Sequence, residues 1–195
     1  MLALAYSGGK DSCLALYELE RQGKEVACLL TTVWKEKGHT VAHEESLDVL
    51  TSQAERLGLP IHFIYTSVST YREDFLHKLK KVKEEYDLKG MAFGDWFIEG
   101  HREWNSALAK EVGLEAYFPL WNPEANLLEE LEAFLSLGFQ AKIVKVDEEK
   151  ISPEWIGRKL DTAFIEVLRQ NPSLCPMGEH GEYHTTVLDG PIFKD

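Results

Sequence analysis

The chain has 195 residues, of which 44% are hydrophobic and 28% are charged, a composition typical of a globular protein with one substantial core. Its formal net charge is −12 and no Lys/Arg cluster dominates, which disfavours a nucleic-acid partner because such partners require a positive surface. Three cysteines without a CxxC pair argue against a disulfide framework or a zinc site, so we expect buried thiols.

The start of the chain shows no targeting signal. Met1 leads directly into a predicted strand without a basic leader, and no apolar run approaches the roughly 20 residues that span a bilayer. We therefore expect a cytoplasmic protein with no membrane partner. The sequence leaves both a monomer and a homodimer open.

Strand-like and helix-like segments alternate through the first 119 residues. The predicted strands are short apolar or β-branched runs at 2–6, 25–34, 61–66, 90–94 and 115–119. The predicted helices carry apolar residues on one side and lie at 12–20, 44–57, 69–86 and 103–111. Five strands separated by helices predict right-handed βαβ units, and hence an α/β fold with a doubly wound five-stranded parallel sheet.

The pattern changes after Pro119. A loop with two asparagines and a proline follows, then a predicted helix at 127–137 and a predicted strand at 140–146. The remainder is polar and contains several glycines. We therefore expect a first domain over 1–119 and a smaller C-terminal α+β lobe over 120–195.

The hexapeptide SGGKDS lies between the first predicted strand and the first predicted helix, where ligands bind in open α/β sheets. Gly8 and Gly9 permit positive φ and close approach of an anion, Lys10 adds a charge, and Ser12 is placed to cap the helix. Asp11 stands where a Walker A loop needs Ser or Thr, and the spacing differs from G-x-G-x-x-G. We predict that the loop binds phosphate through six residues: Ser7, Gly8, Gly9, Lys10, Asp11 and Ser12.

SGGKDS resembles the signature of the PP-loop ATP pyrophosphatases, which split ATP between the α and β phosphates and transfer AMP to an acceptor. The resemblance implies ATP binding and the adenine nucleotide α-hydrolase fold, a five-stranded parallel sheet. It also implies Mg²⁺ bridging the phosphates, with Asp11 and Asp95 as the candidate metal ligands. The strand count reached above agrees with this fold.

Three further stretches narrow the choice of acceptor. They are FGDWFIEGHREW at 93–104, WIGRKLD at 155–161 and GEHGEYHTTVLDGPIF at 178–193. Together with SGGKDS they resemble the diphthine ammonia ligase family over essentially the whole chain. The resemblance implies that ATP, ammonia and the diphthine carboxylate of elongation factor 2 give diphthamide, AMP and pyrophosphate. Two alternatives stay open: a PP-loop enzyme that adenylates another small acceptor, and a nucleotide-binding sensor without turnover.

The resemblance also suggests roles for particular side chains. We expect the catalytic groups to be Lys10, Asp11, Asp95, Glu182 and His184. We expect the acceptor and ammonia to meet His101, Arg102, Glu103, Glu179, Glu182, Tyr183, His184 and Thr185.

Each of these assignments has a structural alternative. Asp95 is also placed to cap a helix, residues 101–103 to form an exposed helical turn, and Tyr183 to face outward from a strand. Cys175 is expected to be a packed thiol rather than a nucleophile. Because SGGKDS is expected to bind ATP by itself, truncation after Leu174 should leave ATP binding within a few-fold.

Overall fold

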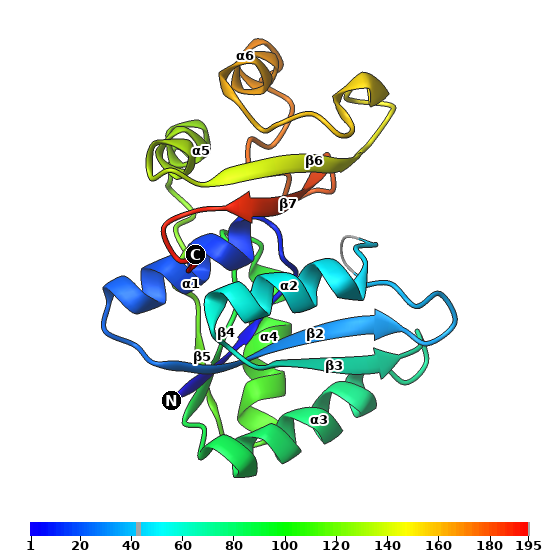
Figure 1. The fold of residues 1–195 in the computed structure, drawn as a ribbon, viewed down its shortest axis with the longest axis vertical. Helices are drawn as coiled ribbons and strands as arrows, with labels where there is room; N and C mark the ends of the chain where they lie inside the picture. The colour runs from blue at the N-terminus through cyan, green and yellow to red at the C-terminus, as the bar shows by residue number, and fades with distance from the viewer. Residues whose placement is uncertain (42–43, 195) are drawn as a thin grey trace.

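The computed structural model describes residues 1–41 and 44–194, in two connected parts (Figure 1). The first part consists of β1 (Leu2–Ala5), α1 (Lys10–Arg21), β2 (Val26–Trp34), α2 (Leu47–Leu57), β3 (Ile61–Thr66), α3 (Tyr71–Tyr86), β4 (Gly90–Ala92), α4 (Glu99–Glu111) and β5 (Glu115–Tyr117). The second part consists of α5 (Leu127–Ser136), β6 (Gln140–Val146), the short 3₁₀ helix η1 (Pro153–Trp155), α6 (Thr162–Gln170) and β7 (Tyr183–Asp189). Among these described residues, no helix has the length and apolar character needed to cross a membrane.

The first part contains the predicted five-stranded parallel sheet, with strand order β3-β2-β1-β4-β5. The chain builds outward from β1 to β3 and then returns to the other side of β1 with β4. The connection after β1 therefore leads to one side of the sheet and the connection after β4 leads to the other side. Between them a crevice opens at the carboxyl edge of the sheet. This architecture confirms the predicted fold class and places SGGKDS at the crevice.

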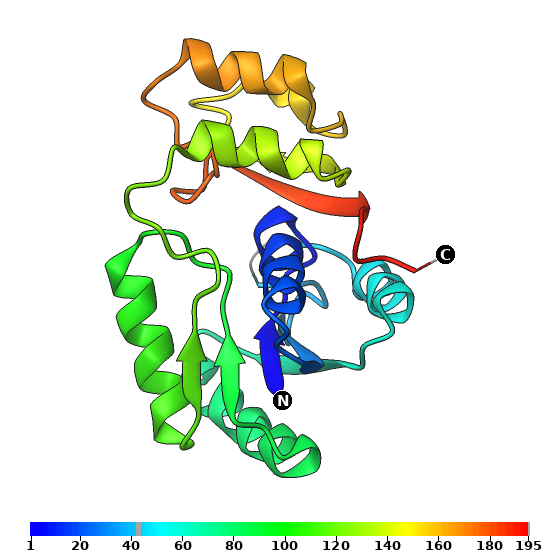
Figure 2. The same ribbon diagram turned by 90° about the vertical axis from the view of Figure 1, so that its left-hand side faces the viewer.

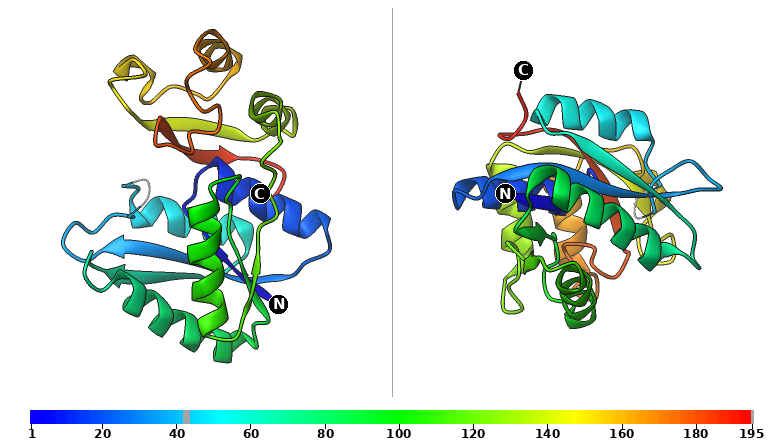
Figure 3. Two further views of the ribbon diagram at one scale, coloured as in Figure 1. Left: turned by 180° about the vertical axis from the view of Figure 1, so that it is seen from behind. Right: turned by 90° about the horizontal axis from the view of Figure 1, so that it is seen from below.

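Helices cover both faces of this sheet (Figures 1 and 3), and alternate residues of a strand face opposite layers. Leu4 and Leu29 are fully buried with the apolar faces of α1 and α2. Their neighbours Ala3 and Leu30 belong to a separate core with α3 and α4. Burial on both faces explains why these strands are continuous apolar runs.

The second part is a two-stranded antiparallel sheet of β6 and β7 covered by two helices. In Figure 2, β7 runs between α1 on one side and α5 and α6 on the other. Its buried side chains join the core of α1 and α2 in one continuous cluster, and Phe139 meets Tyr17 of α1 edge-to-face at 6.0 Å. The two parts therefore share a hydrophobic core.

Two helices begin earlier than predicted. Helix α1 begins at Lys10, and its N-cap is Gly9, so the prediction that Ser12 caps the helix is wrong. Ser12 lies within the first turn, and its hydroxyl donates to the carbonyl of Gly9 at 3.0 Å. Helix α4 begins at Glu99 rather than at residue 103, so residues 101–103 lie inside its first turns.

Helix α6 was not predicted, and a strand at β7 was considered only in the alternative that Tyr183 faces outward from one. Helix α6 has a recognisable signal, because Asp161 caps it by accepting from the amides of Ala163 and Phe164, and Phe164, Ile165 and Leu168 are buried at helical spacing. Strand β7 is β-branched and mostly buried, but its polar residues resemble a site loop.

Strand β7 is hydrogen-bonded to the phosphate loop. The amide of Val187 donates to the carbonyl of Gly8 at 2.9 Å, and the amide of Lys10 donates to the hydroxyl of Thr185 at 3.1 Å. The loop therefore depends on the C-terminal part for its shape. These contacts contradict the expectation that SGGKDS is self-contained.

Truncation after Leu174 should accordingly damage nucleotide binding. The truncated chain lacks β7 and the buried side chains of Tyr183 and Val187, so we expect its free energy of unfolding to fall by at least about 3 kcal/mol. We also expect ATP affinity to fall by more than about tenfold, because two loop contacts of roughly 1 kcal/mol each are lost. Urea unfolding and calorimetry measure both quantities, and an affinity within a few-fold of the full chain would contradict this prediction.

Candidate functional site

Gly8 gives the phosphate loop its conformation. Its φ is +77°, in the left-handed region that favours glycine. A Cβ atom at this position would lie 2.5 Å from Cδ2 of Leu50 and 2.6 Å from Oε1 of Gln53. Both the backbone angle and the packing therefore require glycine here.

The two serines of the loop lie close together across its opening. Their hydroxyl oxygens are 3.3 Å apart, and the amide of Ser7 donates to the Ser12 hydroxyl at 3.3 Å. The amide of Gly9 donates to the Ser7 hydroxyl at 3.4 Å. These contacts hold the loop against the first turn of α1.

Lys10 is almost completely buried, with 3% of its surface exposed. Its ammonium group donates to Oδ2 of Asp11 at 2.8 Å and to the carbonyl of Met177, and it lies 5.1 Å from the centre of the Tyr183 ring. The lysine predicted to meet phosphate therefore also joins the loop to the C-terminal segment.

Strand β4 positions Asp95 on the opposite side of the crevice. Oδ2 of Asp95 accepts from the side-chain amide of Asn105 at 2.9 Å, and Oδ1 lies 3.4 Å from Nδ1 of His101. Burial raises the pKa of the Asp95 carboxyl, and the charge of His101 opposes that rise. The N-cap of α4 is Ile98, so the alternative that Asp95 caps this helix is wrong.

Gly94 and Trp96 bring the end of β4 against α1. A Cβ atom at Gly94 would lie 3.1 Å from the carbonyl oxygen of Asp11, so the close approach of the two backbones favours glycine. The indole of Trp96 donates to Oδ1 of Asp11 at 3.0 Å. The GDW element is thereby held beside the phosphate loop.

The loop that precedes β7 is anchored by Glu182. This carboxylate is 2% exposed and accepts from the amides of Cys175 and His180, both at 3.0 Å. Gly178 has a φ of +71° and packs against the Tyr183 backbone, which also restricts the loop. Glu182 therefore holds the loop, which corrects the expectation that it acts on a substrate.

Tyr183 is also a structural residue. Its ring is 1% exposed and packs edge-to-face on Phe164 at 4.9 Å, while its hydroxyl donates to the carbonyl of Pro176 at 2.5 Å. The alternative of an outward-facing tyrosine is wrong. The expected contact with a substrate cation stays a prediction, and in this structure the cation over the ring is Lys10.

A cavity of about 400 Å³ brings most of the predicted residues together between the loop, β4 and β7. Its lining includes the predicted residues Lys10, Asp11, Asp95, His101, Glu179, Tyr183, His184 and Thr185. Arg102 lies elsewhere, 4.7 Å over the Trp121 ring, and Glu103 is exposed on α4. These two residues of the HREW element are therefore not brought to this cavity.

Glu179 and His184 also line this cavity and have shifted pKa values, chiefly because they are buried. Burial and the nearby charge of Asp11 raise the pKa of Glu179 to about 7, although Lys10 opposes the shift. Burial and the charge of Lys10 lower the pKa of His184. The cavity thus holds a carboxyl that binds its proton more tightly than usual and an imidazole that favours its neutral form.

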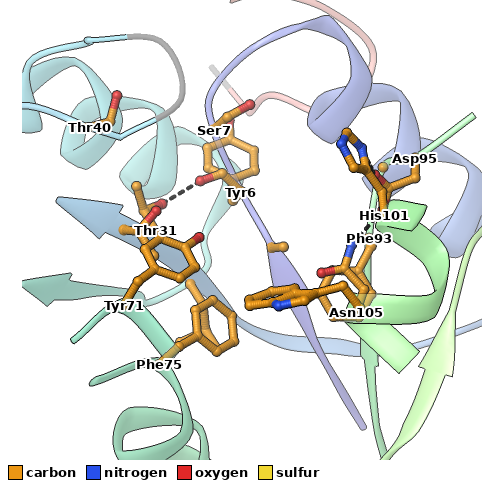
Figure 4. A pocket seen from close by; sticks show the side chains of 15 residues that line it. Tyr6, Ser7, Thr31, Thr40, Tyr71, Phe75, Phe93, Asp95, His101 and Asn105 are labelled. Atoms are coloured by element: carbon orange, nitrogen blue, oxygen red, sulfur yellow. Dashed lines mark hydrogen bonds and ion pairs between the residues drawn. The ribbon is translucent and has the colours of Figure 1, made fainter. Parts of the chain in front are cut away.

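A second cavity of about 380 Å³ lies beyond the ends of β1, β2 and β4 (Figure 4). One wall carries Thr31, Tyr71 and Phe75, and the opposite wall carries Asp95 and His101. Because Asp95 and His101 line both cavities, the two adjoin at these side chains.

Sequence reasoning missed the aromatic wall of the second cavity. Tyr71 and Phe75 lie at helical spacing within the helix predicted at 69–86, a pattern typical of a helix core, yet both line the cavity. Trp104, within the HREW element, is 41% exposed and lines it as well. A tryptophan directly after three polar residues was the signal available in the sequence.

The expected metal ligands are arranged as a pair. Within 1–41 and 44–194, no group of three or more His, Cys, Asp or Glu side chains is placed to hold a metal ion. Asp11 and Asp95 both line the first cavity, and the charge of Asp11 raises the pKa of Asp95. Two carboxylates fit Mg²⁺, which is usually held by one or two carboxylates together with substrate phosphates.

All three cysteines are free and buried, as expected. Burial raises the pKa of the Cys175 thiol. It also raises the pKa values of Cys13 and Cys28, to about 12. A thiol with a raised pKa is a poor nucleophile, so Cys175 is a packed thiol.

The pKa of Glu179 predicts a pH-dependent stability. Between pH 4.5 and about pH 7, Glu179 holds a proton in the folded state that it has released in the unfolded state. The free energy of unfolding therefore falls as pH rises through this range. Glu179→Gln should reduce that fall by about 1–3 kcal/mol. Urea unfolding across this pH range, without ATP or Mg²⁺, measures the free energy of unfolding. The control is Glu148→Gln, at an exposed glutamate. Parallel curves for parent and Glu179→Gln would refute the shift.

Comparison with known proteins relates both parts of the chain to one family. Residues 1–116 match the family model "Diphthamide synthase N-terminal domain", and residues 125–195 match "Diphthamide synthase C-terminal domain". The chain is 27% identical to the diphthine–ammonia ligase of Bos taurus over 99% of its own length and 80% of that protein. It is 28% identical to the diphthine–ammonia ligase of Schizosaccharomyces pombe over 96% of its own length and 34% of that protein.

A solved structure, the U34-tRNA thiolase NcsA from Methanococcus maripaludis, aligns with 70% of this chain and 56% of its own, at a TM-score of 0.44 and 19% identity. The two family models together cover both the phosphate loop and the loop and strand that close the cavity. The chain belongs to the diphthamide synthase family.

Proposed function

We propose that the protein is an ATP-dependent diphthine–ammonia ligase that forms AMP and pyrophosphate. The observation that carries the proposal is the joining of the two family segments at one site. The ammonium group of Lys10 binds Asp11 within the phosphate loop and the carbonyl of Met177 in the C-terminal segment. This contact supports a site in which nucleotide and acceptor chemistry take place side by side.

ATP would span the two adjoining cavities. The second cavity has aromatic and hydroxyl-bearing walls suited to a nucleoside, and Ser7 of the phosphate loop lies at its edge (Figure 4). The triphosphate would then follow the loop toward the N-terminus of α1, whose dipole favours an anion. This path places the α phosphate near Asp95 and His101, where the cavities adjoin.

The acceptor would enter the first cavity. Adenylation turns one carboxylate oxygen of diphthine into part of a leaving group, after which ammonia attacks the carbonyl carbon and AMP departs. Asp11, Asp95 and Glu179 give this cavity acidic walls, although Lys10 pairs with Asp11 and the raised pKa of Glu179, about 7, reduces its negative charge near neutral pH. Such walls favour a cationic ligand. The ammonium ion and the trimethylammonium group of diphthine are both cations.

His184 is suited to proton transfer in the second step. Its lowered pKa favours the neutral imidazole, which can accept a proton from ammonium or from the attacking nitrogen. Mg²⁺ held by Asp11 and Asp95 would neutralise phosphate charge. The chain's own residues would position the reactants.

The products of ATP distinguish this proposal from its alternatives. The full chain should be incubated with ATP, Mg²⁺, ammonium and elongation factor 2 carrying diphthine, and the nucleotides and the modified histidine analysed by mass spectrometry. We expect AMP, pyrophosphate and diphthamide in equal amounts. Formation of ADP contradicts a ligase of this type, and unchanged ATP despite binding supports a sensor. AMP formation only with another carboxylate identifies a different acceptor.

Asp95→Asn tests the charge at the point where the cavities adjoin. The amide keeps the size of the side chain but removes the negative charge, so we expect kcat to fall by about 10²-fold and the Mg²⁺ requirement to rise. Asp87→Asn, at an exposed carboxylate, is the matched control. Unchanged kcat and Mg²⁺ dependence in a folded Asp95→Asn variant would exclude this role.

A further inference from the structure

Gln53 is a buried polar residue on the apolar face of α2. Its neighbours on this face are Leu50, Ala54 and Leu57, and Gln53 itself is only 4% exposed. The side chain reaches the space between the phosphate loop and β7. A buried amide in an apolar face needs hydrogen-bond partners, and its partners indicate what it holds.

Three hydrogen bonds use both ends of the Gln53 amide. Nε2 donates to the carbonyl of Gly8 at 3.1 Å and to the carbonyl of Val187 at 2.6 Å. Oε1 accepts from the hydroxyl of Tyr6 at 2.9 Å. The Gly8 carbonyl also accepts from the amide of Val187 at 2.9 Å, so loop, helix and strand meet at one oxygen.

These partners fix the orientation of the amide. A flipped amide would place Oε1 against two carbonyl oxygens and Nε2 against the Tyr6 hydroxyl, which already contacts the thiol of Cys13. The observed orientation gives each N–H an acceptor and the oxygen a donor. Gln53 is therefore held in one position.

The position of the Gly8 carbonyl determines the direction of the next amide. Gly8 C=O and Gly9 N–H belong to one planar trans peptide, so the N–H points away from the carbonyl. Gln53 and β7 hold that carbonyl on the α2 side. The Gly9 N–H is thereby turned to the opposite side, toward the Ser7 hydroxyl at the N-terminus of α1.

We propose that Gln53 is a positioning residue for ATP, holding the Gly8–Gly9 peptide in the orientation that presents the Gly9 amide to a phosphate oxygen. It acts through the peptide and through β7, without touching the nucleotide. The inference rests on the proposed function only in taking ATP as the ligand of the loop. It explains why a helix that contributes no predicted site residue carries a glutamine in its buried face.

Gln53→Met tests the proposal because it retains side-chain length and removes both donors. All three hydrogen bonds of the amide are lost, two of which hold the loop and β7, so we expect the Kd for ATP, measured by calorimetry with Mg²⁺ and no acceptor, to rise by about 5- to 30-fold. Gln53→Asn, which keeps the amide but is one methylene too short, should raise it in the same direction. It provides a second measurement if Gln53→Met does not fold.

Leu57→Ala is the control for a general loss of stability. Leu57 is 5% exposed on the same helix face, and the alanine should lower the midpoint of urea unfolding without removing a hydrogen bond to the loop. Its Kd for ATP should stay within about twofold of the parent under conditions where both are folded.

The outcomes separate this inference from the proposed function. A folded Gln53→Met or Gln53→Asn variant with parental ATP affinity overturns the positioning role, as does an equal loss of affinity in Leu57→Ala. If the parent chain itself binds no ATP, the proposed function fails instead. A rise in Kd confined to the Gln53 variants supports the inference.

Discussion

The buried ammonium group of Lys10 is the interaction on which the site depends. A lysine that is 3% exposed needs compensation for its lost hydration, and Asp11, the Met177 carbonyl and the Tyr183 ring provide it. These partners come from two separate parts of the chain. The charge therefore connects the phosphate loop to the C-terminal segment, and Glu182 and Gly178 can be understood as the means of holding that segment in place.

Strand β7 extends the same connection along the loop. Thr185 and Val187 hydrogen-bond to Lys10 and Gly8, and the first three residues of the strand, Tyr183 to Thr185, line the cavity. One strand thus serves both as support for the nucleotide loop and as a wall of the proposed acceptor site.

The sequence predicted the elements whose signals are local. All five strands of the parallel sheet and the place of SGGKDS follow from apolar runs and glycine chemistry. The roles of Glu182 and Tyr183 could not be predicted in this way. An acidic and an aromatic residue in a glycine-rich stretch look the same in the sequence whether they face a ligand or the core. Gln53 and Tyr71 were missed for a related reason: each belongs to an amphipathic helix, and the residue it contacts is distant in the chain.

The wall that the two cavities share has a consequence for how strongly their two ligands bind. Asp95 and His101 face both the proposed nucleoside side and the proposed acceptor side, so a ligand in either cavity changes the charge felt in the other. Anionic phosphates beside the acidic cavity would increase its attraction for a cation. A bound cation would in turn reduce the repulsion between those carboxylates and the phosphates. Because such coupling is reciprocal, each ligand would strengthen the binding of the other, and the enzyme would favour the complex in which ATP and the cationic acceptor are present together.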